Sequence, residues 1–255
     1  MIELRMIGCH GGIGGTHRHT TCYGIGEHIV IDAGTGLATL PLEQLARLDH
    51  VVLTHAHLDH VACLPLMIDS VAALRDKALT VWAQKDVIAL LRAHLFNEQI
   101  WPDFTQIPTP ERPFMRFEPM PDNGVDIAGY RFSPLPADHG IPACGYLVEA
   151  GDSAIAFSGD TGDCAAFWQA VTKVSKLKAV AVECSYPVAM TGMAALSMHM
   201  HSGAVAARLR ELPSHIAGVI VHRKPGHEQT IATELTAALP ERDLRLPEPG
   251  TVYRF

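Results

Sequence analysis

Short apolar runs alternate with helical patterns along the whole chain. Runs such as Val51–Leu53 and Ala154–Ala156 are apolar on both faces, which is typical of strands buried between two layers. The predicted strands cover Glu3–Ile7, Ile29–Ile31, Val51–Leu53, Leu79–Ala83, Arg131–Leu135, Tyr146–Glu149, Ala154–Ser158, Ala179–Glu183, Gly218–Val221 and Thr251–Arg254. The predicted helices cover Leu42–Leu48, Val61–Leu74, Asp86–Leu95, Asp163–Val174, Gly203–Glu211 and Glu228–Leu239.

The two halves of the chain follow the same plan, strands and then helices, and no Ser/Gly-rich linker separates them. This order predicts one α/β domain over residues 1–255, built from two sheets packed face to face with helices outside. One segment departs from the pattern. Asn97–Pro113 contains four prolines together with Trp101 and Phe104, and it is predicted to be an extended, irregular insertion that either covers a site or packs as a surface arm.

Composition narrows the class of protein. With 48% hydrophobic and only 18% charged residues among 255, the chain is expected to be ordered and compact. A formal net charge of -7 argues against wrapping a nucleic-acid polymer, although a local basic patch is compatible with it. No apolar stretch reaches membrane-spanning length, and the first residues lack the pattern of a signal peptide. Six scattered cysteines without a CxxC pair predict reduced thiols and a cytoplasmic protein.

The strongest functional signal is the run Thr-His-Ala-His-Leu-Asp-His at residues 54–60, directly after a buried strand. In an extended segment His55 and His57 share a face and can bind one metal ion. If a helix begins after Leu58, Asp59 and His60 lie at its start and can reach a second metal ion. Imidazole and carboxylate together suit zinc, iron or manganese. A solvated, His-rich turn is the alternative, and the apolar flanks on both sides argue against it.

Further candidate metal ligands follow other predicted strands. His139 lies at a turn after Arg131–Leu135, and His222 directly follows a buried strand. Asp160 lies in a Ser-Gly-Asp-Thr-Gly turn, where glycine lets the backbone bend sharply. A single His or Asp at a strand end is commonly a cap or a surface residue. Several of them, added to the run at 54–60, predict a site for two metals.

Two features lie upstream of that run. The loop Gly8–Thr21 carries glycine pairs, but their spacing is wrong for a dinucleotide-binding fingerprint and no helix pattern follows. His17 and His19 in this loop are expected either to line a ligand pocket or to be surface residues. Asp32, which follows a strand, is predicted to orient a metal-bound histidine through the second nitrogen of its ring.

The ordered ligand set resembles the metallo-β-lactamase superfamily. More narrowly, the segments 31–37, 54–65, 96–104 and 222–225 look like class II cyclic-nucleotide phosphodiesterases, and the resemblance runs from about Gly8 to Leu235. It implies a βαβα sandwich, that is, two packed mixed sheets with helices on the outside, and a dinuclear site at one edge of the sheets. It also implies that the glycine-rich loop lies near the substrate.

Carried over by position, the resemblance gives each ligand a role. His55, His57 and His139 would hold one metal, while Asp59, His60 and His222 would hold the other, and Asp160 would bridge the two. The expected cofactors are two divalent ions per chain, Zn²⁺ first and Mn²⁺ or Fe²⁺ as alternatives. Such a pair lowers the pKa of bound water to near neutrality.

The general acid is ambiguous in the sequence. Members of the phosphodiesterase family carry a histidine followed by Leu-Thr-Pro before a helix, and here the segment 196–203 contains both His199 and His201. Alignment on the following helix favours His199, whereas the pattern of the related tRNA-processing ribonucleases favours His201. The predicted catalytic residues are therefore Asp59, His199 and His201, with His199 preferred as the proton donor.

The expected reaction is hydrolysis of a 3′,5′-cyclic nucleotide, cAMP or cGMP, to the 5′-monophosphate. The expected partner is this small substrate, with neither a nucleic-acid polymer nor a membrane. The sequence leaves open whether two copies form a homodimer through Asn97–Pro113. Three alternatives remain: a ribonuclease Z-like nuclease, a thioester or lactone hydrolase on the same scaffold, and a nucleotide-binding module without turnover. A long basic arm would favour the nuclease, and a lost ligand would favour the binding module.

Overall fold

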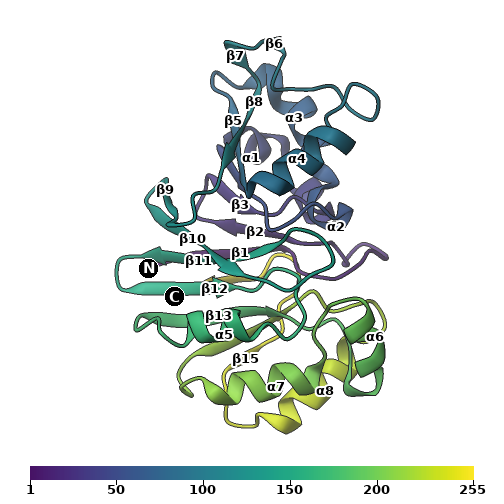
Figure 1. Cartoon of the computed structure of the whole chain (residues 1–255), viewed down its shortest axis with the longest axis vertical. Helices are drawn as coiled ribbons and strands as arrows, with labels where there is room; N and C mark the ends of the chain where they lie inside the picture. Colours follow the sequence, from purple (N-terminus) through teal and green to yellow (C-terminus); the bar gives the residue numbers. More distant parts are fainter.

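Two seven-stranded sheets lie face to face, with helices on both outer sides, in the computed structural model, which describes residues 1–255 (Figure 1). The first sheet has the order β16-β1-β2-β3-β4-β5-β8 and the second has the order β15-β14-β13-β12-β11-β10-β9. In each sheet an antiparallel part continues into a parallel part. The two halves therefore share one plan, as the sequence predicted.

The strand bounds are as follows. The first sheet contains β1 (Glu3–Gly8), β2 (Cys22–Ile25), β3 (Ile29–Ile31), β4 (His50–Val52), β5 (Leu79–Ala83), β8 (Met115–Pro119) and β16 (Val252–Arg254). The second contains β9 (Val125–Ile127), β10 (Tyr130–Pro136), β11 (Cys144–Ala150), β12 (Ser153–Phe157), β13 (Leu177–Glu183), β14 (Ala217–Val221) and β15 (Leu244–Arg245). A separate hairpin joins β6 (Pro108–Thr109) to β7 (Arg112–Pro113).

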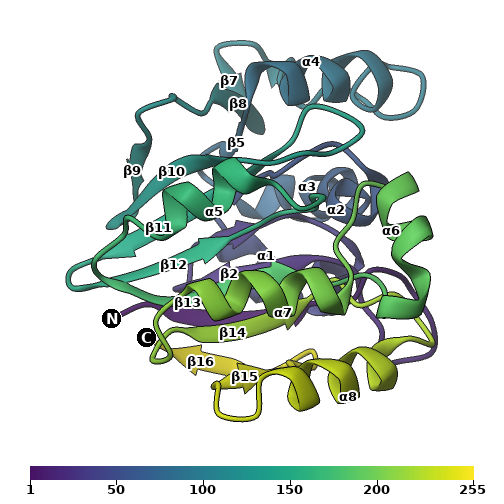
Figure 2. The same cartoon turned by 60° about the horizontal axis from the view of Figure 1, so that its bottom comes forward.

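Helices cover the outer face of each sheet. On the first half these are α1 (Leu42–Arg47), α2 (Leu58–Val61), α3 (Cys63–Val71) and α4 (Lys85–His94), with the 3₁₀ turns η1 (Thr35–Thr39) and η2 (Ala72–Leu74). On the second half they are α5 (Ala165–Val171), α6 (Thr191–Leu196), α7 (Ser202–Glu211) and α8 (Glu228–Ala238), with η3 (Val188–Met190). Figure 2 shows α5 and α7 lying along the second sheet and α6 standing at its end. No helix combines the length and hydrophobicity needed to cross a membrane.

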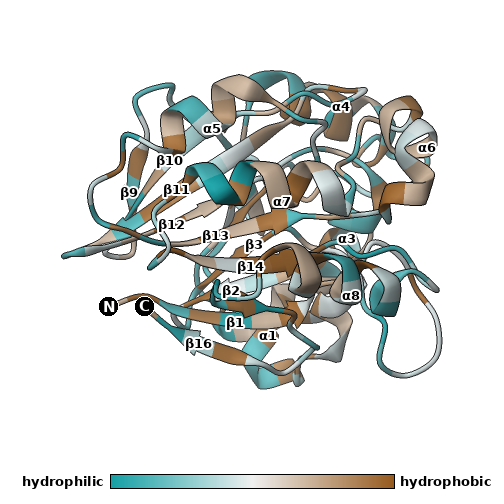
Figure 3. Ribbon diagram, turned by 90° about the horizontal axis from the view of Figure 1, so that it is seen from below, coloured by the Kyte–Doolittle hydropathy of each residue, from teal (hydrophilic) through white to brown (hydrophobic).

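Apolar side chains fill three layers, which explains why so many strands read as apolar on both faces. One layer lies between the sheets, and the other two lie between each sheet and its helices. Figure 3 shows the hydrophobic colours gathered on the strands and the hydrophilic ones on exposed turns and helix faces. Tyr146 crosses between the sheets, where its buried hydroxyl donates to the Leu53 carbonyl at 2.8 Å. Burial of one such large side chain stabilises the fold by roughly 1.5–3 kcal/mol.

The predicted strands are confirmed to within two residues at each end, and one predicted helix is present but interrupted. Residues 61–74 do not form a continuous helix: α2 ends at Val61, α3 begins at Cys63, and η2 follows. Pro65 explains the break, because it has no N–H to donate to the carbonyl of Val61. The predicted helix over residues 163–174 is shorter in the structure. Strands β2, β8, β9 and β15 and helix α6 were not predicted at all.

The insertion Asn97–Pro113 is less irregular than predicted, since it contains the β6–β7 hairpin. It packs on the outside of the first half, where Phe104 is buried in the same apolar layer as α3 and α4. Its hairpin lines a cleft of about 600 Å³ together with residues 75–80. None of its residues lines the pockets beside the candidate metal centre. The structure thus favours the surface arm over the covering role, and dimerisation through it stays a prediction.

Candidate metal centre

The predicted ligands gather at one end of the sandwich. His55, His57, Asp59 and His60 follow β4, while His139, Asp160 and His222 follow β10, β12 and β14. In both Figure 1 and Figure 2, α2 and α6 lie at this end, and the two chain termini lie at the other. The carboxyl ends of parallel strands meet at the same edge of a sheet, which is why residues so distant in the chain converge.

The first group consists of three histidines. Nδ1 of His57 lies 3.1 Å from Nε2 of His55 and 3.1 Å from Nε2 of His139. His139 is held by a 3.1 Å hydrogen bond between its Nδ1 and the carbonyl of Met198. His55 is fully buried, and Nδ1 of its ring lies 3.0 Å from the hydroxyl of Thr54. Each ring therefore turns one nitrogen toward a common point.

The second group combines two histidines with two carboxylates. Nε2 of His222 lies 3.2 Å from Oδ2 of Asp59, 3.2 Å from Oδ2 of Asp160 and 3.4 Å from Nε2 of His60. Oδ2 of Asp160 also lies 3.2 Å from Nε2 of His60 and 3.7 Å from Nε2 of His55. This one oxygen atom is thus close to a ring nitrogen of both groups, as a bridging ligand would be.

Neighbouring side chains fix the orientation of the ligands. Nδ1 of His60 donates to Oδ2 of Asp32 at 2.7 Å, and Asp32 also accepts hydrogen bonds from the amide and hydroxyl of Thr54. The predicted contact between Asp32 and a histidine of the site is confirmed. Asp32 and His222 both have positive φ, 60° and 56°, so the backbone is strained at the supporting residue and at a candidate ligand.

The charges of the cluster fit ligation by a cation. Burial and the neighbouring His60 lower the pKa of His55, and burial and His139 lower that of His57, so both rings are neutral near pH 7. Burial alone would lower the pKa of His60, but Asp160 and Asp32 outweigh it and raise this pKa. Burial alone would raise the pKa of Asp160, but His222 and His60 outweigh it and lower it.

The donor geometry also fits. Nδ1 of His60 donates to Asp32, so a neutral His60 turns an unprotonated Nε2 toward carboxylate oxygens at 3.2 and 3.9 Å. Lone pairs that converge in this way repel each other unless a proton or a metal ion lies between them. Ligand atoms bound tetrahedrally at about 2.0 Å are separated by about 3.3 Å. The 3.1–3.4 Å separations within the two groups are of this size.

His199 stands beside both groups, and its ring centroid lies 5.3 Å from that of His139 and 5.2 Å from that of His222. Its Nδ1 lies 2.7 Å from Oε1 of Glu183. Glu183 is almost fully buried and also accepts hydrogen bonds from the Thr161 amide and the Ser185 hydroxyl. Burial alone would lower the pKa of His199, but Glu183 outweighs it and raises this pKa.

Sequence reasoning missed Glu183, which was assigned only to the end of a strand. A carboxylate as the last residue of an otherwise apolar run, Ala179–Val182, was a signal that could have found it. His201 has a different place from His199. It is the N-cap of α7, and its Nδ1 accepts a hydrogen bond from the Ala204 amide at 3.4 Å. Of the two candidate proton donors, the structure brings only His199 to the metal ligands.

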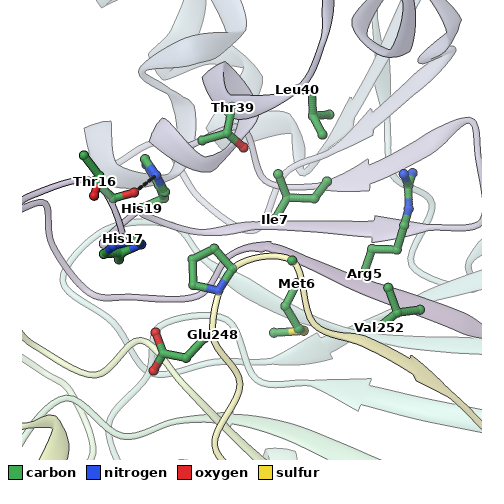
Figure 4. A pocket seen from close by; sticks show the side chains of 12 residues that line it. Arg5, Met6, Ile7, Thr16, His17, His19, Thr39, Leu40, Glu248 and Val252 are labelled. Carbon is green, nitrogen blue, oxygen red and sulfur yellow. Dashed lines mark hydrogen bonds between the residues drawn. The ribbon is translucent and has the colours of Figure 1, made fainter.

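The glycine-rich loop touches the centre at Gly11, where a Cβ atom would lie 2.8 Å from Nδ1 of His222. The two histidines of the loop lie elsewhere. His17 and His19 line a separate pocket of about 560 Å³, whose wall also includes Met6 and Glu248 (Figure 4). His17 is exposed and His19 half-buried, with Nε2 of His19 3.2 Å from the Thr16 carbonyl. They do not line the metal centre.

Comparison with known proteins agrees with this arrangement. A family model described as "Beta-lactamase superfamily domain" matches residues 27–223. A probable 3′,5′-cyclic-nucleotide phosphodiesterase of Yersinia pestis is 28% identical over 152 residues, which are 53% of this chain and 43% of that protein. The endoribonuclease ysh1 of Schizosaccharomyces pombe is 28% identical over 151 residues, 53% of this chain and 19% of that protein. The matched part thus spans less than half of either relative.

Solved structures show the same fold at low identity. The metallo-beta-lactamase fold protein YhfI from Bacillus subtilis superposes with a TM-score of 0.79 at 15% identity, over 99% of this chain and 98% of that one. Unliganded yeast PDE1 superposes with a TM-score of 0.78 at 18% identity, over 96% of both chains. The predicted sandwich fold and the resemblance to cyclic-nucleotide phosphodiesterases are confirmed.

Proposed function

The chain belongs to the beta-lactamase superfamily, and we propose that it is a metal-dependent phosphodiesterase that hydrolyses 3′,5′-cyclic nucleotides, cAMP or cGMP, to 5′-monophosphates. One observation carries the proposal: Oδ2 of Asp160 lies within 3.7 Å of ring nitrogens from both ligand groups, beside a histidine paired with a buried carboxylate. A dinuclear cation site with an adjacent acid suits displacement at phosphorus. The similarity to the Yersinia pestis relative supports this substrate class.

In this proposal His55, His57 and His139 would hold one metal and Asp59, His60 and His222 would hold the other, with Asp160 available to both. When bound, the two divalent cations supply positive charge for the phosphate oxygens and lower the pKa of water. We propose Zn²⁺ first, with Mn²⁺ or Fe²⁺ as alternatives. The side chain of Asp59 is 30% exposed, and we assign it a second role in orienting the attacking water.

His199 would protonate the leaving oxygen. Its Nδ1 is committed to Glu183, so Nε2 is the atom that can carry a proton toward the substrate. The Glu183 carboxylate stabilises the protonated ring, because a negative charge beside an imidazole favours its charged form. A positioned acid of this kind contributes typically 10²–10⁴ in rate. For a cyclic nucleotide the protonated atom is O3′, and the product is the 5′-monophosphate.

Two finer expectations belong to the same proposal. The six cysteines are all free, which fits a reducing compartment, and we place the protein in the cytoplasm. The proposed substrate is a small molecule. Association of two copies of the chain is a separate proposal, which light scattering tests, and a mass equal to one chain would contradict it. All six free cysteines are buried or half-buried, so no exposed thiol competes with the centre for metal.

A nuclease acting on RNA is the second candidate. The similarity to ysh1 favours it, as does the cleft beside the insertion, which presents Arg75, Lys77, Arg112 and Arg116. Arg75 and Lys77 share the single carboxylate of Asp49, and two further acidic residues, Asp76 and Glu111, line the same cleft, so its net positive charge is small. We therefore rank the nuclease below the cyclic-nucleotide hydrolase.

The test uses purified protein loaded with Zn²⁺ or Mn²⁺ and supplied with cAMP, cGMP or bis(p-nitrophenyl) phosphate. We expect release of 5′-nucleotide, and we expect its loss in His57→Ala, which removes the ligand between His55 and His139. His215→Ala is the matched control, since His215 is exposed and lies outside the cluster. Absence of phosphodiester turnover in protein that carries two metals per chain would contradict the proposal.

A further inference from the structure

A pocket of about 330 Å³ adjoins the metal centre on the side of His199. Its wall includes Asp138, Gly162 and Asp163, and two small residues of α6, Ala194 and Ala195. We call it the α6 pocket. Two of its lining residues connect it to the candidate metal ligand His139. Asp138 directly precedes His139 in the chain, and the carbonyl of Met198 is hydrogen-bonded to the His139 ring.

One of the two carboxylates in the wall of the α6 pocket has no charged partner. Asp163 is paired with Arg208 through two contacts, at 2.7 and 3.1 Å. Asp138, by contrast, is exposed, and its carboxylate has neither a hydrogen bond nor a salt bridge, whereas its backbone amide donates to the Thr161 hydroxyl at 2.8 Å. A free carboxylate only accepts hydrogen bonds, and it repels a second anion.

We propose that the α6 pocket receives the alcohol half of the phosphodiester and restricts it to an uncharged group that donates hydrogen bonds. Asp138 accepts a hydrogen bond from a substrate hydroxyl in this pocket. This inference rests on the proposed phosphodiesterase activity and adds a selectivity to it. The preferred substrate has one phosphate, which lies at the metals, and its leaving half carries no phosphate.

The position of the general acid, His199, indicates which half of the substrate lies in the α6 pocket. His199 lies on the boundary between the ligand groups and the α6 pocket, since it belongs to the pocket wall and its ring lies 5.2–5.3 Å from the rings of His139 and His222. The oxygen that it protonates is bonded to the leaving carbon, so the leaving group enters the α6 pocket. In a cyclic nucleotide the 2′-hydroxyl is adjacent to O3′, and it is the nearest donor for Asp138.

Charge separates this substrate from RNA. When an RNA strand is cut so that a 3′-oxygen leaves, the leaving nucleotide carries a further phosphate on its 5′ side. That phosphate would enter the same region as the free Asp138 carboxylate. A cyclic nucleotide or an unphosphorylated dinucleotide has no such group, so the pocket favours the small diester over the polymer.

The experiment compares two matched substrate pairs on metal-loaded protein: cAMP against 2′-deoxy-cAMP, and ApA against its 5′-phosphorylated form pApA. We expect the wild type to prefer the ribose substrate by about ten- to a hundredfold in kcat/KM, the usual effect of a hydrogen bond to a charged group. We expect ApA to be preferred over pApA by about tenfold. Asp138→Asn should shrink both ratios toward one. Ratios on one preparation cancel any change in metal occupancy.

Asp152→Asn is the matched control, because Asp152 is an exposed carboxylate in the turn before β12, and it should keep both ratios. Thermal midpoint and metal content of Asp138→Asn confirm that the variant is folded. Unchanged ratios in Asp138→Asn overturn the inference. If only dinucleotides are hydrolysed, the proposed function fails while the ApA pair still decides the inference. If no diester is hydrolysed, both fail.

Discussion

Asp32 and His60 are joined by a 2.7 Å hydrogen bond in the interior of the protein, where both side chains are only 1% exposed. The contact fixes which nitrogen of His60 is free, since Nδ1 carries the proton that Asp32 accepts. A buried carboxylate that orients a ligand histidine raises the affinity of the site for metal.

Replacing Asp32 should therefore weaken metal binding without removing a ligand. In Asp32→Asn the side chain keeps its shape and tolerates the positive φ, but it loses the charge that favours the Nδ1 proton. We expect a 10- to 100-fold loss of Zn²⁺ affinity, measured by competition with a chromophoric chelator. Asp152→Asn serves as the control. Equal affinities in the two variants would show that Asp32 has no part in the site.

Replacing His199 and His201 one at a time should separate an effect on catalysis from an effect on stability. His199→Gln should lower kcat by about 10²–10⁴ with metal content unchanged, because it removes the proton donor. His201→Ala should cost about 1 kcal/mol of stability through loss of the α7 cap, with a far smaller effect on kcat. Steady-state kinetics and urea unfolding on both variants check this. A larger loss of kcat in His201→Ala would reverse the assignment.

Metal ions should stabilise the fold. Zn²⁺ at about a hundredfold its dissociation constant is expected to raise the free energy of unfolding by about 2.7 kcal/mol over chelator-treated protein. The reason is that the ring nitrogens and carboxylates of the two groups converge only in the folded protein, so the cation binds the folded state and not the unfolded chain. Urea titrations with and without chelator measure the difference, and His60→Ala should remove most of it while His215→Ala retains it. Coincident titrations for the wild type would argue that no cation binds.

Asp49 provides a test of pH dependence away from the metal centre. Burial raises its pKa, but hydrogen bonds from Lys77 and from the buried Arg75 outweigh this and lower it. A lowered carboxylate pKa contributes stability above its unfolded value of about 3.9, and this is lost as the pH falls through the folded pKa. Asp49→Asn should cost about 1–3 kcal/mol at pH 7, and the difference from wild type should shrink below about pH 3.9.

The control for that measurement is Asp126→Asn, because Asp126 forms an exposed pair with Arg131 and should contribute about 0–1 kcal/mol. Urea unfolding at pH 7 and below about pH 3.9 measures the free energy of unfolding of each variant and of the wild type. Protonation of the metal ligands at low pH affects the variants and the wild type alike, so it cancels in the differences. A difference between Asp49→Asn and wild type that persists at low pH would contradict the assigned ion pair.

The sequence by itself determined the features that depend on neighbours along the chain. The spacing of His55 and His57 in an extended segment places them on one face, and a helix start places Asp59 and His60 together. Most strands and the order of the candidate ligands also follow from local pattern. Pro65 broke a predicted helix because a missing N–H outweighs apolar periodicity.

Only the tertiary structure decided which strand ends meet. It brought Glu183 to His199, turned His201 away to cap α7, and left the Asp138 carboxylate free in a pocket beside the acid. The physical reason is that a side-chain contact depends on the register of strands that pair over long distances in sequence, which no local pattern contains. The sequence thus determined which residue types could bind metal, and the packing of the sheets determined which side chains contact them.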